Sequence, residues 1–121
     1  MDKAEILIYQ TDKKSARLAV RYEDETVWLT QAQMSELFQT TRNNISLHIS
    51  NVFKEKDLVE NSVCKDSLLT AADNKQYKTK LYNLDLIISV GYRVKSLRWT
   101  QFRIWANKVL KDYLLKGYAI I

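Results

Sequence analysis

Residues 42–51, with the sequence RNNISLHISN, contain side chains that could recognise the edges of DNA bases. Arginine can bond guanine at two points, asparagine can bond adenine at two points, and an apolar tip can touch the methyl group of thymine. Nearly all the polar groups in this segment can donate or accept a hydrogen bond without carrying a charge. The residues expected to contact bases are Arg42, Asn43, Asn44, Leu47, His48 and Asn51.

Two short helices would position these side chains, and residues 29–53 predict both. The first helix is expected to begin at Thr30, whose hydroxyl can cap it while Gln33 completes a capping box. The spacing of Ser35, Gln39 and Ile45 matches that of a helix-turn-helix, although alanine and glycine are commoner at the first two positions. The expected buried residues are Met34, Leu37 and Phe38 on the first helix and Ile45, Ile49, Val52 and Phe53 on the second.

Other interpretations of this segment are an ordinary two-helix hairpin with a solvated polar face, or a catalytic site with His48 as a general base. The chain has one histidine, one cysteine and two glycines. It therefore lacks a glycine-rich phosphate loop, a dinucleotide fingerprint and a Cys/His metal set. We expect no catalytic residue, no metal site and no cofactor.

The 121 residues are expected to form one domain with a modest core that needs no disulfide or metal. The single cysteine, Cys64, cannot form an internal disulfide, which fits a reducing cytoplasm. No apolar run approaches the roughly 20 residues that span a membrane, and the N-terminus lacks the apolar centre of a signal peptide. The sequence therefore predicts a cytoplasmic protein that does not enter a membrane.

Positive charge is concentrated in the C-terminal part of the chain. The net charge is +5 and the isoelectric point is near 9.3, as is common among nucleic-acid-binding domains. Residues 75–121 hold ten basic and two acidic side chains, a net charge of +8, so the other 74 residues carry −3. The residues expected to contact phosphates are Thr41, Lys75, Lys78, Lys80, Arg93, Lys95, Arg98 and Arg103.

The remaining segments predict an α+β fold. Short β-rich runs at 5–9, 17–22 and 26–29 indicate a small antiparallel meander, with Glu23-Asp24-Glu25 as a turn. Runs at 62–70 and 76–82 are joined by residues 71–75, whose Asp73-Asn74 pair tolerates the left-handed backbone of a tight turn. They indicate a β-hairpin wing, which either rests on the DNA backbone or is only a solvated surface hairpin. Two C-terminal helices should follow: a short apolar one weakened by Gly91, and a longer one capped by Ser96 and stopped by Gly117.

Several apolar residues near the C-terminus fall outside the main apolar stripe of the last helix. They are Ile104, Leu115, Ile120 and Ile121. We expect them to form a homodimer interface or to pack against a further C-terminal domain.

Two stretches of the chain, TVWLTQAQMSELF and LYNLDLIISVGYRVKSLRWTQFRIWANKVLKDYLLKGYAI, resemble the N-terminal domain of the bacterial RhuM family of virulence proteins. The family pattern is present at Tyr82, Leu84, Asp85, Ile88, Gly91, Tyr92, Arg93, Arg98, Thr100 to Arg103, Trp105 and Ala106. The chain departs from it at Trp99, where glycine is common. The resemblance implies kinship with the KilA-N and Bro-N phage-type DNA-binding domains, and it implies that the chain is the N-terminal module of a longer protein.

The sequence thus favours a winged helix-turn-helix-like domain that binds double-stranded DNA in a transcriptional regulator or a phage or virulence-associated protein. A protein-interaction or oligomerisation module of a toxin-antitoxin or defence system is the main alternative. A third reading makes the chain the targeting domain of a toxin whose catalytic part lies elsewhere.

Overall fold

The computed structural model of the protein describes residues 4–10, 17–70 and 72–120, without the side chains of residues 69, 70 and 114–120. Within this part of the chain, five strands form one antiparallel sheet in the order β1-β2-β3-β5-β4, accompanied by five helices. The α+β class is confirmed. The elements are β1 (Glu5–Gln10), β2 (Arg17–Glu23), β3 (Thr26–Thr30), α1 (Gln31–Leu37), α2 (Arg42–Lys54), α3 (Glu60–Val63), β4 (Cys64–Thr70), β5 (Gln76–Asn83), α4 (Leu84–Val94) and α5 (Arg98–Ile120).

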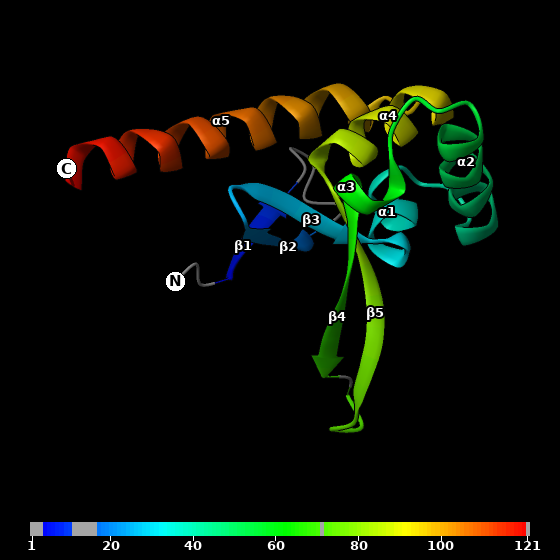
Figure 1. Cartoon of the computed structure of the whole chain (residues 1–121), viewed down its shortest axis with the longest axis horizontal. Coiled ribbons are helices and arrows are strands. Elements are labelled where there is room, and N and C mark those ends of the chain that lie inside the picture. The colour runs from blue at the N-terminus through cyan, green and yellow to red at the C-terminus, as the bar shows by residue number, and fades with distance from the viewer. Residues whose placement is uncertain (1–3, 11–16, 71, 121) are drawn as a thin grey trace.

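The helices α4 and α5 lie over one side of the sheet, and α1 and α2 stand together at one end of it (Figure 1). The β4–β5 hairpin extends away from this body (Figure 1). The core between helices and sheet is apolar, as the strand alternation of Leu18 and Val20 predicts. Its largest fully buried side chains are Leu29, Met34, Leu37, Ile45, Leu86, Ile87 and Phe102.

The meander and the hairpin form one sheet, a pairing that the sequence analysis does not predict. Strand β3 pairs with β5 through Trp28 with Asn83, Leu29 with Tyr82, and Thr30 with Leu81. The two runs lie more than 50 residues apart in sequence, and no local pattern marks such a pairing. The hairpin therefore continues the main sheet.

The α1–α2 pair has the predicted start and turn. Thr30 and Gln33 form the expected capping box, with the Thr30 hydroxyl accepting from the Gln33 backbone N–H at 3.1 Å. Gln39, between the helices, has a φ of 55°, the left-handed conformation for which glycine is the usual residue. The predicted stripe of α2 is buried at Ile45, Ile49 and Val52, while Phe53 is partly buried.

Helix α4 begins where β5 ends. The Asn83 side chain caps it by accepting from the Leu86 backbone N–H at 3.3 Å. The helix continues through Gly91 to Val94 and ends at Lys95, whose φ is 59°. The helix is not interrupted at Gly91. The missing side chain lets two rings approach: a Cβ there would lie 2.3 Å from Trp99 Cδ1 and 2.8 Å from Phe38 Cζ.

Helix α5 is longer than expected. Ser96 accepts from the Arg98 backbone N–H at 3.1 Å, as predicted for a residue at the helix start. The helix does not stop at Gly117 but runs to Ile120, because glycine lowers helix stability by only about 1 kcal/mol when the backbone stays helical. Tyr9 on β1 packs on Phe102 and Trp105, with ring centroids 5.2 and 5.0 Å away, and this contact holds α5 on the sheet.

We predict that Gly91→Ala destabilises the protein by about 1–3 kcal/mol, because the added methyl group must displace Trp99 or Phe38 in a packed core. Chemical denaturation followed by circular dichroism would measure the loss. Ser89→Ala, on the same helix and half-buried, is the control and should change stability by less than about 0.5 kcal/mol. If the two variants lowered the free energy of unfolding equally, the close packing of Trp99 and Phe38 on Gly91 would not contribute to stability.

Candidate nucleic-acid interface

The first turn of α2 presents uncharged and basic side chains to solvent. Thr41 caps the helix by accepting from the Asn44 backbone N–H at 3.0 Å. The Asn44 side chain turns back and donates to the Thr40 hydroxyl at 2.8 Å, so it helps to hold the turn. Arg42 and Asn43 are exposed.

The next turns of α2 carry the remaining side chains that the sequence assigned to base contact. Leu47 is exposed, whereas His48 and Asn51 are half-buried. The exposed side of α2 thus begins at Arg42 and continues through Asn43 and Leu47.

Gln31 at the start of α1 fixes the angle between the two helices on their exposed side. Its amide nitrogen donates to the Arg42 carbonyl at 3.0 Å and to the Ser46 hydroxyl at 2.6 Å. This contact was not predicted, because its partners are 11 and 15 residues away and meet only once the helices are packed. It holds the first turn of α2 at a defined position relative to β3.

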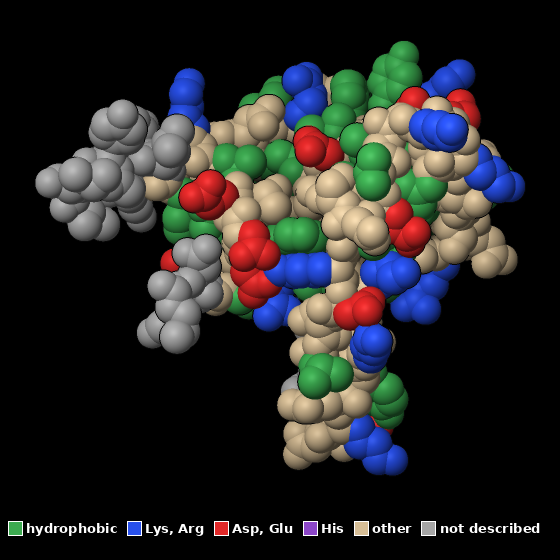
Figure 2. Space-filling model, viewed as in Figure 1, with side chains coloured by type: hydrophobic (Ala, Val, Ile, Leu, Met, Phe, Trp, Pro, Cys, Tyr) green, Lys and Arg blue, Asp and Glu red, His purple; other side chains and the backbone are tan. Residues whose placement is uncertain are grey.

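An open cleft of about 530 Å³ lies between this helix pair and the hairpin. Thr30, Gln31, Ala32 and Arg42 line it from the helix side, and Lys78, Thr79, Lys80 and Tyr82 line it from β5. Figure 2 shows Lys and Arg side chains along the edge of the hairpin that faces α2. The structure therefore brings three of the predicted basic residues, Arg42, Lys78 and Lys80, to one groove.

The two lysines of the cleft have carboxylate neighbours that hold them weakly. Lys78 Nζ lies 3.3 Å from Asp66, and Lys80 Nζ lies 3.6 Å from Glu60. All four side chains are about half-exposed or more, and such pairs contribute about 0–1 kcal/mol each. A phosphate could replace these carboxylates at little cost. The pKa of Lys80 is raised by the negative charges that Cys64 and Tyr82 acquire at high pH and by Glu60.

The tip of the hairpin adds Lys75, which is exposed. The predicted Asp73-Asn74 turn is confirmed: Asn74 has a φ of 65°, and Asp73 accepts from the Lys75 backbone N–H at 3.0 Å. Tyr77 donates to the Asp73 carboxylate at 2.7 Å, which lowers the pKa of Asp73. The turn is therefore braced by its own side chains.

Four predicted phosphate contacts, Arg93, Lys95, Arg98 and Arg103, lie on α4, at its end, or on α5 and do not line the cleft. Arg93 binds two carboxylates that follow α2, with Nη1 2.8 Å from Glu55 and Nη2 against Asp57. A phosphate at Arg93 would have to displace both. These basic residues therefore form a second group, apart from the cleft.

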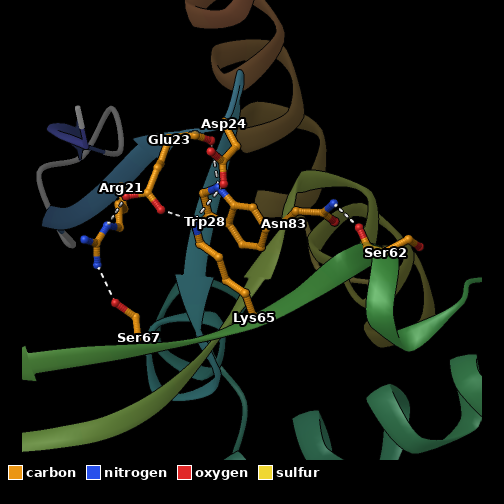
Figure 3. A network of polar contacts seen from close by, with 8 residues as sticks. All are labelled: Arg21, Glu23, Asp24, Trp28, Ser62, Lys65, Ser67 and Asn83. Carbon is orange, nitrogen blue, oxygen red and sulfur yellow. Dashed lines mark hydrogen bonds and ion pairs between the residues drawn. The ribbon is translucent and has the colours of Figure 1, made fainter. Parts of the chain in front are cut away.

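A polar network joins the hairpin to the β2–β3 turn (Figure 3). Lys65 on β4 binds Glu23 and Asp24, the latter at 2.9 Å, and its ammonium lies 4.3 Å from the centre of the Trp28 ring. Arg21 donates to the Ser67 hydroxyl at 3.0 Å. The acidic turn is occupied by this lysine, and the network fixes the base of the hairpin on the sheet.

The residues proposed for an oligomer interface are described only in part. Ile104 on α5 is 59% exposed, as expected for an apolar residue outside the core stripe. The side chains of Leu115 and Ile120, and all of Ile121, lie outside the described residues. Within that described set, no three His, Cys, Asp or Glu side chains are grouped so that they could hold a metal ion. Likewise, no described helix combines the length and apolar character needed to cross a membrane.

The fold and this interface define an α+β domain with a basic cleft between a helix pair and a hairpin. Residues 62–121 match the model of the virulence protein RhuM family. The match confirms the RhuM resemblance for the second of the two stretches and covers β4, β5, α4 and α5. Helices α1 and α2 lie outside the matched range. No curated protein and no solved structure matches the chain.

Proposed function

We propose that the protein is a sequence-specific double-stranded DNA-binding domain, with α1 and α2 as a helix-turn-helix and the β4–β5 hairpin as a wing. The observation that carries the proposal is the shared cleft: Arg42 at the start of α2 faces Lys78 and Lys80 on β5. The first residues of a recognition helix lie nearest the bases, and a wing contacts the adjoining backbone. The kinship with KilA-N and Bro-N domains that the resemblance implies points to the same activity.

The proposal divides the side chains by role. Asn43 and Leu47 are exposed on α2 and are assigned to base edges, together with Arg42. Lys75, Lys78 and Lys80 are assigned to phosphates. Asn44 is given a lesser part because its amide already bonds Thr40.

Binding to duplex DNA should weaken steeply with salt. The cleft and the hairpin tip offer three cations to phosphates, Lys75, Lys78 and Lys80, so log affinity should fall against log salt with a slope of roughly −3. Fluorescence anisotropy on a mixed-sequence duplex between low and physiological salt would measure it. Absence of duplex binding at low salt, or binding that salt does not affect, would refute the proposal.

Two matched variants should separate base contacts from phosphate contacts. Asn43→Ala should cost about 1–3 kcal/mol on a duplex selected from a random library and almost nothing on unrelated duplexes. Lys78→Gln should weaken all duplexes alike and reduce the salt slope by about 1. If Asn43→Ala weakened every duplex equally, α2 would be acting on the backbone and the proposed sequence reading would be wrong.

A second candidate, an oligomerisation module, is favoured by exposed isoleucines. Ile6 and Ile8 are at least half-exposed on the edge strand β1, and Ile104 is exposed on α5. Exposed apolar side chains on an edge strand favour association between chains.

If α5 forms the homodimer interface, Ile104→Lys should convert dimers into monomers at tens of micromolar in sedimentation experiments, while Ile8→Lys should not. The physical reason is that a charge buried in an apolar interface is costly. A wild-type protein that sediments only as a monomer would exclude the homodimer. If Ile8→Lys dissociated the dimer and Ile104→Lys did not, the interface would lie on β1 and not on α5.

A further inference from the structure

The corner between α4 and α5 combines an exposed aromatic ring with positive charge. Tyr92 is 70% exposed, and its ring meets that of Trp99 edge-on, with centroids 5.9 Å apart. Arg93, Lys95, Arg98 and Arg103 carry positive charge at or next to this corner, while Glu55 and Asp57, which bind Arg93, carry negative charge, so the balance is positive. Lys95, three residues after Tyr92, is exposed at the end of α4.

A cleft of about 440 Å³ opens beside these rings. Its lining residues are Asp57, Ile88, Ser89, Tyr92, Arg93 and Trp99. Two contacts fix the side chains that line this cleft. Trp99 donates its indole N–H to the Ile88 carbonyl at 2.8 Å, and Arg93 is bound by the carboxylates of Glu55 and Asp57. Arg103 lies over the other ring, with its guanidinium carbon 5.0 Å from the Trp99 centroid.

We propose that this corner binds single-stranded nucleic acid, with one unpaired base stacked on Tyr92 at the cleft and the adjoining phosphates near Lys95. Every base has a π-face, so an exposed aromatic ring among cations binds single strands with little sequence preference. Asp57 and Ser89 at the cleft supply polar groups that could bond a base edge.

A duplex does not fit this chemistry because its bases are stacked on one another and hide their faces. A protein segment could also insert an apolar side chain beside Tyr92. The positive charge of the corner, however, complements a phosphate chain directly, whereas a peptide would need acidic residues at matching positions. The observations therefore favour a nucleic-acid strand over a peptide.

The corner is separate from the cleft between α2 and the hairpin. Arg42 is at the start of α2, whereas Glu55 and Asp57, which bind Arg93, follow its last residue. A helix of 13 residues is about 20 Å long, so the two surfaces lie at opposite ends of α2. Single-strand binding at this corner is therefore distinct from duplex binding and does not depend on it.

Fluorescence anisotropy with a 15-nucleotide oligo(dT) labelled at its 5′ end tests the proposal. Tyr92→Ala should weaken binding roughly tenfold, since one stacked base is lost, and Tyr92→Phe should bind like the wild type because it keeps the ring. Leu97→Ala is the matched control: Leu97 is a 95% exposed apolar neighbour and should have no effect.

The proposal is overturned if the wild-type protein does not bind oligo(dT), or if Tyr92→Ala binds it as tightly as the wild type. It is also overturned if Leu97→Ala loses as much as Tyr92→Ala, since that result would indicate an apolar docking patch for a protein. Lys78→Gln separates the two functions: it should weaken duplex binding and leave oligo(dT) binding unchanged. If the protein bound oligo(dT) but not the duplex, the proposed duplex-binding function would be refuted and the single-strand site at Tyr92 would stand.

Discussion

The pairing of β3 with β5 is the constraint on which the rest of the structure depends. Both strands end at a residue that caps the next helix: Thr30 on β3 caps α1, and Asn83 on β5 caps α4. Because Trp28 pairs with Asn83 and Thr30 with Leu81, the pairing of two strands fixes the starting points of two helices at once. It also joins β1, β2 and β3 to the hairpin in one sheet, so a single core of Leu29, Ile45, Ile87 and their neighbours can form between the sheet and the helices.

The same pairing creates the basic cleft. Thr30 and Gln31 leave β3 beside Lys80 and Tyr82 of β5, and Gln31 then binds the first turn of α2. The positions of the α2 side chains relative to the hairpin thus follow from the register of β3 with β5 and from the contacts of the Gln31 amide. Lys78 and Lys80 are in weak, exposed ion pairs, so they can exchange their carboxylate partners for phosphates at little cost. The corner at Tyr92 lies at the far end of α2 and is held by a different contact, the double ion pair of Arg93.

Features decided by neighbouring residues could be predicted from the sequence. The Thr30 capping box, the apolar stripe at Ile45, Ile49 and Val52, and the Asp73-Asn74 turn each depend on residues a few positions apart. Features decided by distant residues could not. The β3–β5 pairing, the Gln31 contacts and the binding of Arg93 by Glu55 and Asp57 join residues 11 to more than 50 positions apart. The sequence predicts that Gly91 weakens its helix, but it does not predict that Trp99 and Phe38 pack against Gly91, because such a contact appears only in three dimensions.

The central claim is that the first turn of α2 and the facing strand β5 bind duplex DNA together. Backbone amide chemical shifts of the isotope-labelled protein, titrated with a selected duplex, test this most directly. The account predicts that the largest shifts fall on residues 41–48 and 78–80, with residues 5–10 of β1 unchanged. Shifts confined to β1 and the outer face of the sheet, or shifts on β5 with none on α2, would contradict it.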